Sequence, residues 1–229
     1  MQTIGLIGGM SWESSAVYYQ ALNRGVQQRY GGLSSAKTVL ASVDLAEVTA
    51  LQEQGKWDEV GDILAAAGRS VEAAGADFLL LATTTFHRVA DQVTDAVSIP
   101  VLHLADVIAE AVKARGLDSV GFIAPSFAMS HDFFTARIAS HGIAVHVPDA
   151  AHHEAVNRIV YDELVHGKVL NASRRIIVGL VDELWDAGAK GLVLGTTELE
   201  LLVKQADVEL PLFPATTLHV DAALARALG

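Results

Sequence analysis

Hydroxyl side chains follow two matching stretches of this sequence. In each stretch an Ala-Gly-Ala turn precedes a short apolar run, residues 78–82 in the first copy and 191–194 in the second. A short apolar run bounded by turn residues is typical of a parallel strand that is buried on both faces. The polar residues that come next are Thr83, Thr84 and Thr85 in the first copy and Thr196, Thr197 and Glu198 in the second. Because open α/β sheets bind ligands at this end of their strands, the hydroxyls and nearby backbone N–H groups could surround a substrate carboxylate.

A structural explanation of these residues stays open. Threonine is common at strand ends and at helix N-termini, which accounts for one such cluster more easily than for two that repeat. Glu198 has two roles open to it. It is either a carboxylate in the first turn of a helix or a group that orients a neighbouring base.

Histidines also follow the expected strand ends. His87, His103 and His219 each lie soon after one, where a histidine is more often a structural group than a catalyst. His87 remains a candidate supporting residue that activates Thr83. The run His152-His153-Glu154 lacks the His-Glu-x-x-His pattern and is expected to be solvated surface. No cluster has the spacing of metal ligands, so we expect no metal site.

Glycines near the N-terminus invite a nucleotide-binding interpretation. Gly5, Gly8 and Gly9 lack the Gly-x-Gly-x-x-Gly spacing, and no Gly-Lys-Ser/Thr sequence is present. The alternative, which we favour, is a turn that needs small residues because a ligand or a helix approaches it.

Composition excludes several classes of function. The 229 residues carry a formal net charge of −11, and an acidic chain without a basic run is a poor partner for nucleic acid or anionic membranes. The chain has no cysteine, which excludes disulfides, thiolate metal sites and cysteine nucleophiles. No apolar run approaches the ~18 residues of a membrane span, and the sequence opens with a strand and no charged leader. The default expectation is a soluble cytoplasmic protein.

The apolar pattern predicts strands that alternate with helices. The expected strands cover residues 2–7, 37–43, 78–82 and 99–102 in the first half, and 119–124, 143–147, 191–194 and 212–213 in the second. The expected helices cover residues 11–29, 45–52, 57–74, 86–91, 105–114, 130–141, 150–166, 170–187 and 217–228. Such alternation indicates a parallel sheet in each half.

The repeat extends beyond the threonine clusters. Thr3-Ile4-Gly5-Leu6-Ile7 matches Ser119-Val120-Gly121-Phe122-Ile123, and Ile99-Pro100-Val101-Leu102 matches Leu210-Pro211-Leu212-Phe213. The matches keep their order, which predicts two homologous halves. The first half is expected to comprise residues 1–101 plus 212–229, and the second residues 102–211, with a cleft between them.

Four motifs together resemble the aspartate/glutamate racemase family. They are the run from Ile4 to Ser14 (Ile-Gly-Leu-Ile-Gly-Gly-Met-Ser-Trp-Glu-Ser), Ser42-Val43-Asp44, Thr83-x-Thr85-x-His87, and Gly195-x-Thr197-Glu198. The similarity covers nearly the whole chain, and the N-terminal motif is specific to the broad amino-acid racemase branch. The resemblance implies two pseudo-symmetric α/β domains, each a four-stranded parallel sheet flanked by helices, with the active site in the cleft between them.

The resemblance also implies a mechanism. Family members move a proton at the substrate α-carbon between two bases, typically cysteines, without a cofactor. Carried onto this sequence, the two positions are Thr83 and Thr196. Met10 and Gln52 match positions near the family's substrate pocket, and Thr84, Thr85, Thr197 and Glu198 are expected to bind the substrate with them. A small carboxylate or amino acid is the expected partner, and a homodimer through Trp12 and Tyr18-Tyr19 is an alternative to a core role for these aromatics.

The sequence departs from the family pattern mainly in its second half. The usual Gly-Thr-x-x-Thr motif is replaced by residues 124–128, Ala-Pro-Ser-Phe-Ala, and a common Asp after the last strand is Pro214. A threonine hydroxyl is a far weaker acid than a thiol and needs an activating partner. Three functions therefore stay open: a racemase for aspartate-like or glutamate-like substrates, a related decarboxylase or lyase, and a small-carboxylate binder without turnover.

Overall fold

The computed structural model describes residues 1–229 and divides them into two compact units. The first unit comprises residues 1–104 and 219–229, and the second comprises residues 105–218. The chain thus leaves the first unit three residues later than the expected boundary at residue 101. It returns seven residues later than the expected boundary at residue 212. The second difference arises because residues 212–214 form a strand that pairs within the second sheet.

The first unit is built on a parallel sheet of three strands in the order β2-β1-β3. Its strands are β1 (Ile4–Gly8), β2 (Thr38–Ser42) and β3 (Phe78–Leu81). A fourth strand was expected over residues 99–102. Only one bridge forms there, between Leu79 and Val101, because Pro100 has no amide N–H with which to extend the ladder.

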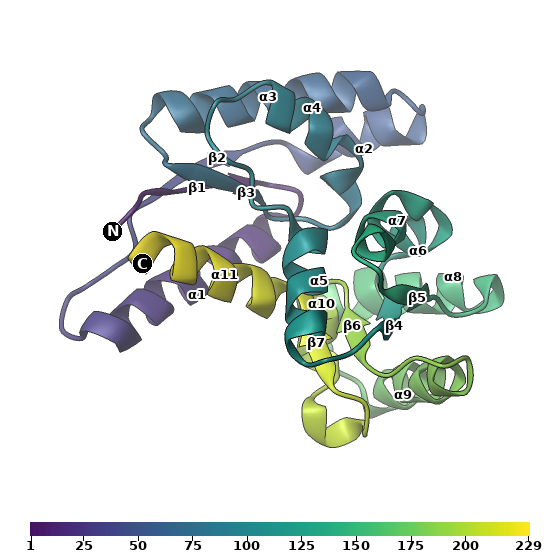
Figure 1. Cartoon of the computed structure of the whole chain (residues 1–229). Helices are drawn as coiled ribbons and strands as arrows, with labels where there is room; N and C mark the ends of the chain where they lie inside the picture. The colour runs from purple at the N-terminus through teal and green to yellow at the C-terminus, as the bar shows by residue number, and fades with distance from the viewer. The chain divides into compact units, whose positions relative to one another are not determined.

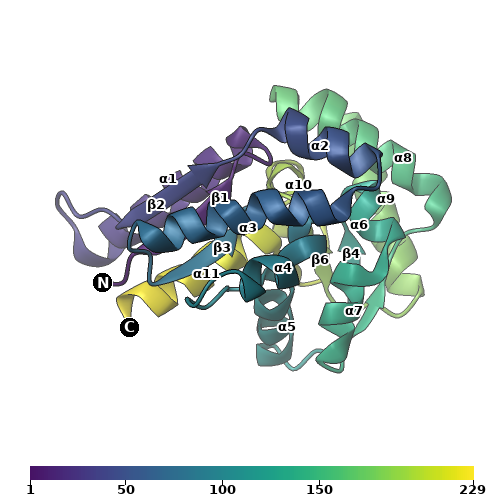
Figure 2. The same ribbon diagram turned by 90° about the horizontal axis from the view of Figure 1, so that it is seen from above.

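Helices cover both faces of this sheet. They are α1 (Trp12–Tyr30), α2 (Leu45–Glu53), α3 (Trp57–Ala73), η1 (Thr85–Val89), α4 (Ala90–Asp95) and most of α11 (Ala215–Leu228). Alternate residues of a strand point to opposite faces. Ile7 accordingly packs into one core cluster with Leu64 of α3, whereas Leu6 packs into another with Leu22 of α1 and Ala223 of α11. Figures 1 and 2 show α3 on one face and α1 with α11 on the other.

Helix α1 begins as the sequence predicts. Ser11 caps it, because its side-chain oxygen accepts the Ser14 N–H at 3.1 Å. Of the three aromatics considered for a dimer interface, Tyr18 lies in the core, whereas Trp12 is 68% exposed and Tyr19 is 50% exposed. A homodimer through the exposed pair stays a prediction.

The second unit contains a parallel sheet of four strands in the order β5-β4-β6-β7. Its strands are β4 (Ser119–Ile123), β5 (Ala144–His146), β6 (Leu192–Leu194) and β7 (Leu212–Pro214). Its helices are α5 (Leu104–Ala114), α6 (Ser126–Ser130), α7 (Asp132–Ser140), α8 (Ala150–Arg158), η2 (Ile159–Glu163), η3 (Leu164–His166), α9 (Asn171–Asp186), α10 (Thr197–Leu202) and η4 (Gln205–Asp207). Phe122 of β4 stacks on Phe134 of α7, with ring centroids 5.3 Å apart. A Cβ on the preceding residue, Gly121, would meet Leu184 of α9, so α7 and α9 cover opposite faces (Figure 1).

The two units share one topology. The central strand comes first in sequence in each sheet, with the second strand on one side and the third on the other: β2-β1-β3 and β5-β4-β6. The matched sequence motifs fall on equivalent strands, β1 with β4 and β3 with β6. This is the α/β class with parallel sheets and flanking helices that the sequence predicts. No helix of the structure has both the length and the apolar character that a membrane span requires.

Candidate functional site

The first threonine cluster lies at the carboxyl edge of the first sheet. Thr83 follows the end of β3, and Thr84 is buried just before η1 begins at Thr85. Met10 follows the end of β1, the strand next to β3, and is also buried. The structure therefore brings Met10 and these threonines to one sheet edge. Gln52 is half-buried near the end of α2.

The turn before Met10 explains the N-terminal glycines. Gly9 has a φ of +88°, and a Cβ there would lie 2.0 Å from the Val43 carbonyl oxygen. A Cβ on Gly8 would meet the Ser15 hydroxyl of α1 at 2.5 Å. This turn needs small residues because backbone and helix approach it closely, as the favoured interpretation states.

His87 holds the backbone of this edge. The Leu104 N–H donates to His87 Nε2 at 3.3 Å, and His87 Nδ1 lies 2.7 Å from the Thr83 carbonyl oxygen. Because a backbone N–H only donates, Nε2 must be the acceptor, and Nδ1 carries the proton that it donates to Thr83. Both ring nitrogens of a neutral imidazole are thereby engaged with the main chain. In this arrangement His87 positions Thr83, and it would have to give up one of these bonds to act as a base.

The other two histidines pack beside it. The ring centroid of His103 lies 4.5 Å from that of His87. His219 is fully buried, its Nε2 lies 2.8 Å from the Leu102 carbonyl oxygen, and its Nδ1 lies 3.0 Å from the Tyr18 hydroxyl. The carbonyl can only accept, so Nε2 donates and Nδ1 accepts from Tyr18. Burial lowers the pKa of His219 to about 4, against an opposing contribution from the Leu102 hydrogen bond.

The second cluster lies at the carboxyl edge of the second sheet. Thr196 follows β6, is 9% exposed, and caps α10. Its Oγ1 accepts the Glu198 N–H at 3.1 Å and the Leu199 N–H at 3.2 Å. The Thr197 hydroxyl donates to Glu198 Oε2 at 2.8 Å. Glu198 is therefore a first-turn carboxylate of α10, one of the two roles open to it from the sequence.

Capping decides what the Thr196 hydroxyl can do chemically. An alcohol oxygen has two lone pairs and one proton. Both lone pairs accept N–H groups here, so the proton is what remains for a ligand. The same two N–H groups would stabilise negative charge on the oxygen after the proton has left. Thr196 is built to donate a proton or a hydrogen bond.

The altered loop after β4 has a partner that the sequence did not reveal. Ser126 opens α6, and its N–H donates to the side-chain oxygen of Asn157 on α8 at 2.9 Å. His153, also on α8, was expected to be solvated, and that expectation is wrong. It is buried between the Ser130 hydroxyl and the Pro148 carbonyl oxygen, each 3.0 Å from a ring nitrogen. This face of α8 turns inward against α6, and no motif in the sequence marks it.

Glu200 compensates for the unusual Pro214. Its carboxylate accepts the Thr216 N–H at 2.7 Å and the Thr217 hydroxyl at 2.8 Å. Burial raises the pKa of Glu200, and these hydrogen bonds act in the opposite direction. Glu200 thereby satisfies the N-terminus of α11, where Pro214 offers no side-chain acceptor.

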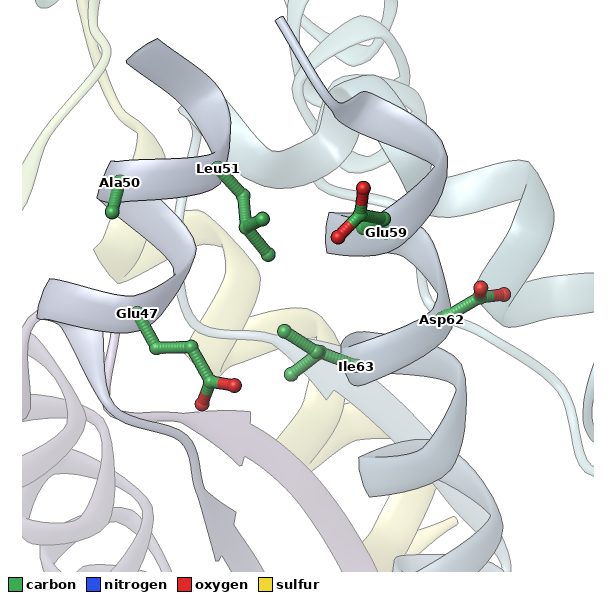
Figure 3. Close-up of a pocket in the computed structure, with 6 residues that line it drawn as sticks. All are labelled: Glu47, Ala50, Leu51, Glu59, Asp62 and Ile63. Carbon is green, nitrogen blue, oxygen red and sulfur yellow. The ribbon is translucent and has the colours of Figure 1, made fainter. Parts of the chain in front are cut away.

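A pocket of about 440 Å³ opens between α2 and α3 (Figure 3). Glu47 and Leu51 of α2 point into it, and so do Glu59 and Ile63 of α3, whereas Asp62 points away. None of the predicted site residues lines this pocket.

The profile of the Asp/Glu/Hydantoin racemase family matches residues 7–223. This chain belongs to that family, as the resemblance predicted.

Two solved structures are similar over 100% of both chains. A protein from Yersinia pestis, described as a putative Asp/Glu racemase, is 40% identical with a TM-score of 0.94. PH1733 from Pyrococcus horikoshii OT3, an aspartate racemase homologue, is 30% identical with a TM-score of 0.90. Arylmalonate decarboxylase shares the fold at 14% identity, with a TM-score of 0.51 over 99% of this chain and 92% of its own.

Proposed function

We propose that this protein is a cofactor-independent amino-acid isomerase that transfers a proton at the α-carbon of an aspartate-like or glutamate-like substrate. Family membership supports the reaction class, and the names of the two similar structures support the substrate class. The observation that carries the proposal is the Thr196 hydroxyl, whose proton is available and whose oxygen is held by two N–H groups.

Thr83 and Thr196 take the two proton-transfer positions in this proposal. They follow β3 and β6, which are equivalent strands of the two units. Thr196 delivers a proton to the α-carbon, and the two N–H groups stabilise the alkoxide that it leaves. Thr83 starts the step as an alkoxide, takes up the α-proton and ends as a neutral hydroxyl, and the His87 hydrogen bond to its carbonyl oxygen fixes its backbone. Because two hydroxyls replace stronger thiol acids and each ~1.4 kcal/mol of barrier is tenfold in rate, we expect slow turnover.

The remaining predicted residues bind the substrate. Thr84, Thr85 and Met10 lie at the sheet edge beside Thr83, and in this proposal Gln52 of α2 joins them. Glu198 is a carboxylate in the first turn of α10 that accepts the Thr197 hydroxyl, and its negative charge suits the substrate ammonium group. Thr197 thereby orients this carboxylate.

A second candidate is decarboxylation. Loss of CO₂ from a substrate carboxylate leaves a carbanion, which needs one proton and no base. The Thr196 hydroxyl can donate its proton, whereas both of its lone pairs accept backbone N–H groups. It therefore fits a step that needs an acid and no base. The carbanion takes the hydroxyl proton, and water returns it.

Proton NMR in deuterated water tests both candidates. L- and D-aspartate and L- and D-glutamate are incubated with the wild type, with Thr83→Cys, with Thr196→Cys and with the double variant. Loss of the α-proton signal with inversion supports the isomerase, and loss of substrate with release of CO₂ supports the decarboxylase. Binding without exchange in all four proteins contradicts both and leaves a carboxylate-binding protein.

A further inference from the structure

The helix that follows β5 changes form in the middle. It runs as α8 to Arg158, passes through one π-helical turn at Ile159–Glu163, and ends in the 3₁₀ turn η3. A π turn inserts an extra residue into a helix and is frequent at functional sites. Asn157 and Tyr161 flank the start of this turn and are four residues apart, a spacing that puts two side chains on one face of a helix.

The Asn157 side chain presents two donors. Its Oδ1 accepts the Ser126 N–H at 2.9 Å. Because that partner is a donor, the amide oxygen must face it, and the NH₂ group points the other way. Asn157 is only half-buried, so this NH₂ group is within reach of a ligand.

The Tyr161 hydroxyl is a donor of the same kind. Tyr161 is 51% exposed, yet burial around the hydroxyl and the nearby charge of Glu198 both raise its pKa. A phenol whose pKa rises above its ordinary value of about 10 keeps its proton throughout the neutral range. Tyr161 therefore has a proton to donate to a ligand and carries no charge.

This face of the helix adjoins both strand-end loops of the second sheet. Asn157 contacts Ser126, which follows β4, and η3, which continues the helix just beyond Tyr161, contacts α10, which follows β6. β4 and β6 are neighbours, and the Gly195 N–H donates to the Ile123 carbonyl oxygen at 2.8 Å where they end. The two uncharged donors thus flank the edge that carries Thr196.

We propose that Asn157 and Tyr161 are substrate-binding residues that donate hydrogen bonds to a carboxyl or carbonyl oxygen of the amino-acid substrate. This inference rests on the proposed function and deepens it. Uncharged donors can donate to an ionised carboxylate or to a neutral amide oxygen, whereas a substrate side chain without oxygen gains nothing from them. The pair is therefore a specificity determinant when the oxygen belongs to the substrate side chain.

The test is a set of binding isotherms for L-aspartate, L-asparagine and L-alanine, with α-proton exchange recorded on the same samples. Asn157→Asp keeps the size of the side chain and its acceptor for Ser126, but replaces the NH₂ group with a negatively charged oxygen. Tyr161→Phe removes only the hydroxyl. The controls are Asn171→Asp, which adds the same charge at an exposed position of the same unit, and Tyr30→Phe on the exposed part of α1.

We expect Asn157→Asp to weaken L-aspartate binding by about tenfold or more and Tyr161→Phe by about threefold to tenfold. Unchanged L-alanine binding assigns the pair to the side-chain oxygen, and equal losses for all three ligands assign it to the α-carboxylate. Both results support the inference. Wild-type binding that neither variant alters by more than twofold overturns it and leaves the proposed function standing. A wild type that neither binds nor exchanges any of the three amino acids overturns both.

Discussion

His219 Nε2 donates to the Leu102 carbonyl oxygen across 2.8 Å. Leu102 lies just before the chain leaves the first unit, and His219 is the residue at which the chain returns to it. One hydrogen bond of a fully buried imidazole therefore joins the two segments in which the chain leaves and re-enters the first unit. The hydroxyl of Tyr18 on α1 donates to the other ring nitrogen of His219.

This arrangement predicts an acid-sensitive contribution to stability. The pKa of His219 is about 4 in the folded protein and about 6.5 when unfolded. The unfolded chain therefore binds more protons between these values, so stability falls as pH falls through this window. The full difference corresponds to about 3 kcal/mol. Urea unfolding of the wild type at pH 7.0, 5.5 and 4.5 should show this loss.

His219→Gln isolates the contribution. Glutamine retains a donor for Leu102 but does not titrate, so this variant should lose less stability than the wild type between pH 7.0 and 4.5, even though it starts lower. His152→Gln, at an exposed histidine of α8, should behave as the wild type does. Parallel pH dependences for the wild type and His219→Gln would refute the assignment.

His87 yields a separate prediction, because both of its ring nitrogens engage backbone groups. His87→Ala leaves the Thr83 carbonyl and the Leu104 N–H without partners, which should reduce the free energy of unfolding by about 2–4 kcal/mol. Denaturant unfolding measures this, with His166→Ala at an exposed position as the control. A variant as stable as the control, with α-proton exchange alone abolished, would instead make His87 a base.

The glycine turn after β1 predicts a contrast between two substitutions. Gly9→Ala combines a left-handed backbone with a Cβ 2.0 Å from the Val43 carbonyl oxygen, and it should cost about 3 kcal/mol or more. Gly31→Ala also has a positive φ, +72°, but its Cβ would meet no atom within 4 Å, so it should cost about 1 kcal/mol. Equal losses in urea unfolding would show that backbone conformation alone matters at Gly9.

Local signals in the sequence were enough to predict the elements that carry the threonine clusters. Thr83 and Thr196 follow short apolar runs between an Ala-Gly-Ala turn and a polar turn, and both lie just past a strand end in the structure. The capped start of α1 at Ser11 was equally local. These features depend on residues adjacent in the chain, which is why the sequence predicts them.

Features that depend on packing between distant segments were missed. His153 is buried because α8 turns one face toward α6, and a polar helix sequence does not reveal which face that is. The π turn beside Asn157 has no sequence motif. The second domain boundary was misplaced because residues 212–214 pair with β6, and pairing between strands is a long-range property.

Thr196 supplies the last prediction, because one hydroxyl both caps α10 and, in the proposed function, delivers the proton. Thr196→Ser keeps both roles and should retain stability and α-proton exchange. Thr196→Val has nearly the same shape but can neither accept the N–H groups of Glu198 and Leu199 nor donate. It should cost about 1 kcal/mol of stability and abolish exchange.

Thr197→Val is the matched control, because the Thr197 hydroxyl donates to Glu198 and does not cap the helix. It should weaken substrate binding while exchange persists at saturating substrate. Denaturant unfolding and proton NMR in deuterated water measure the two effects on the same preparations. If Thr196→Val loses stability but still exchanges the α-proton, the hydroxyl serves the helix alone and another group must supply the proton.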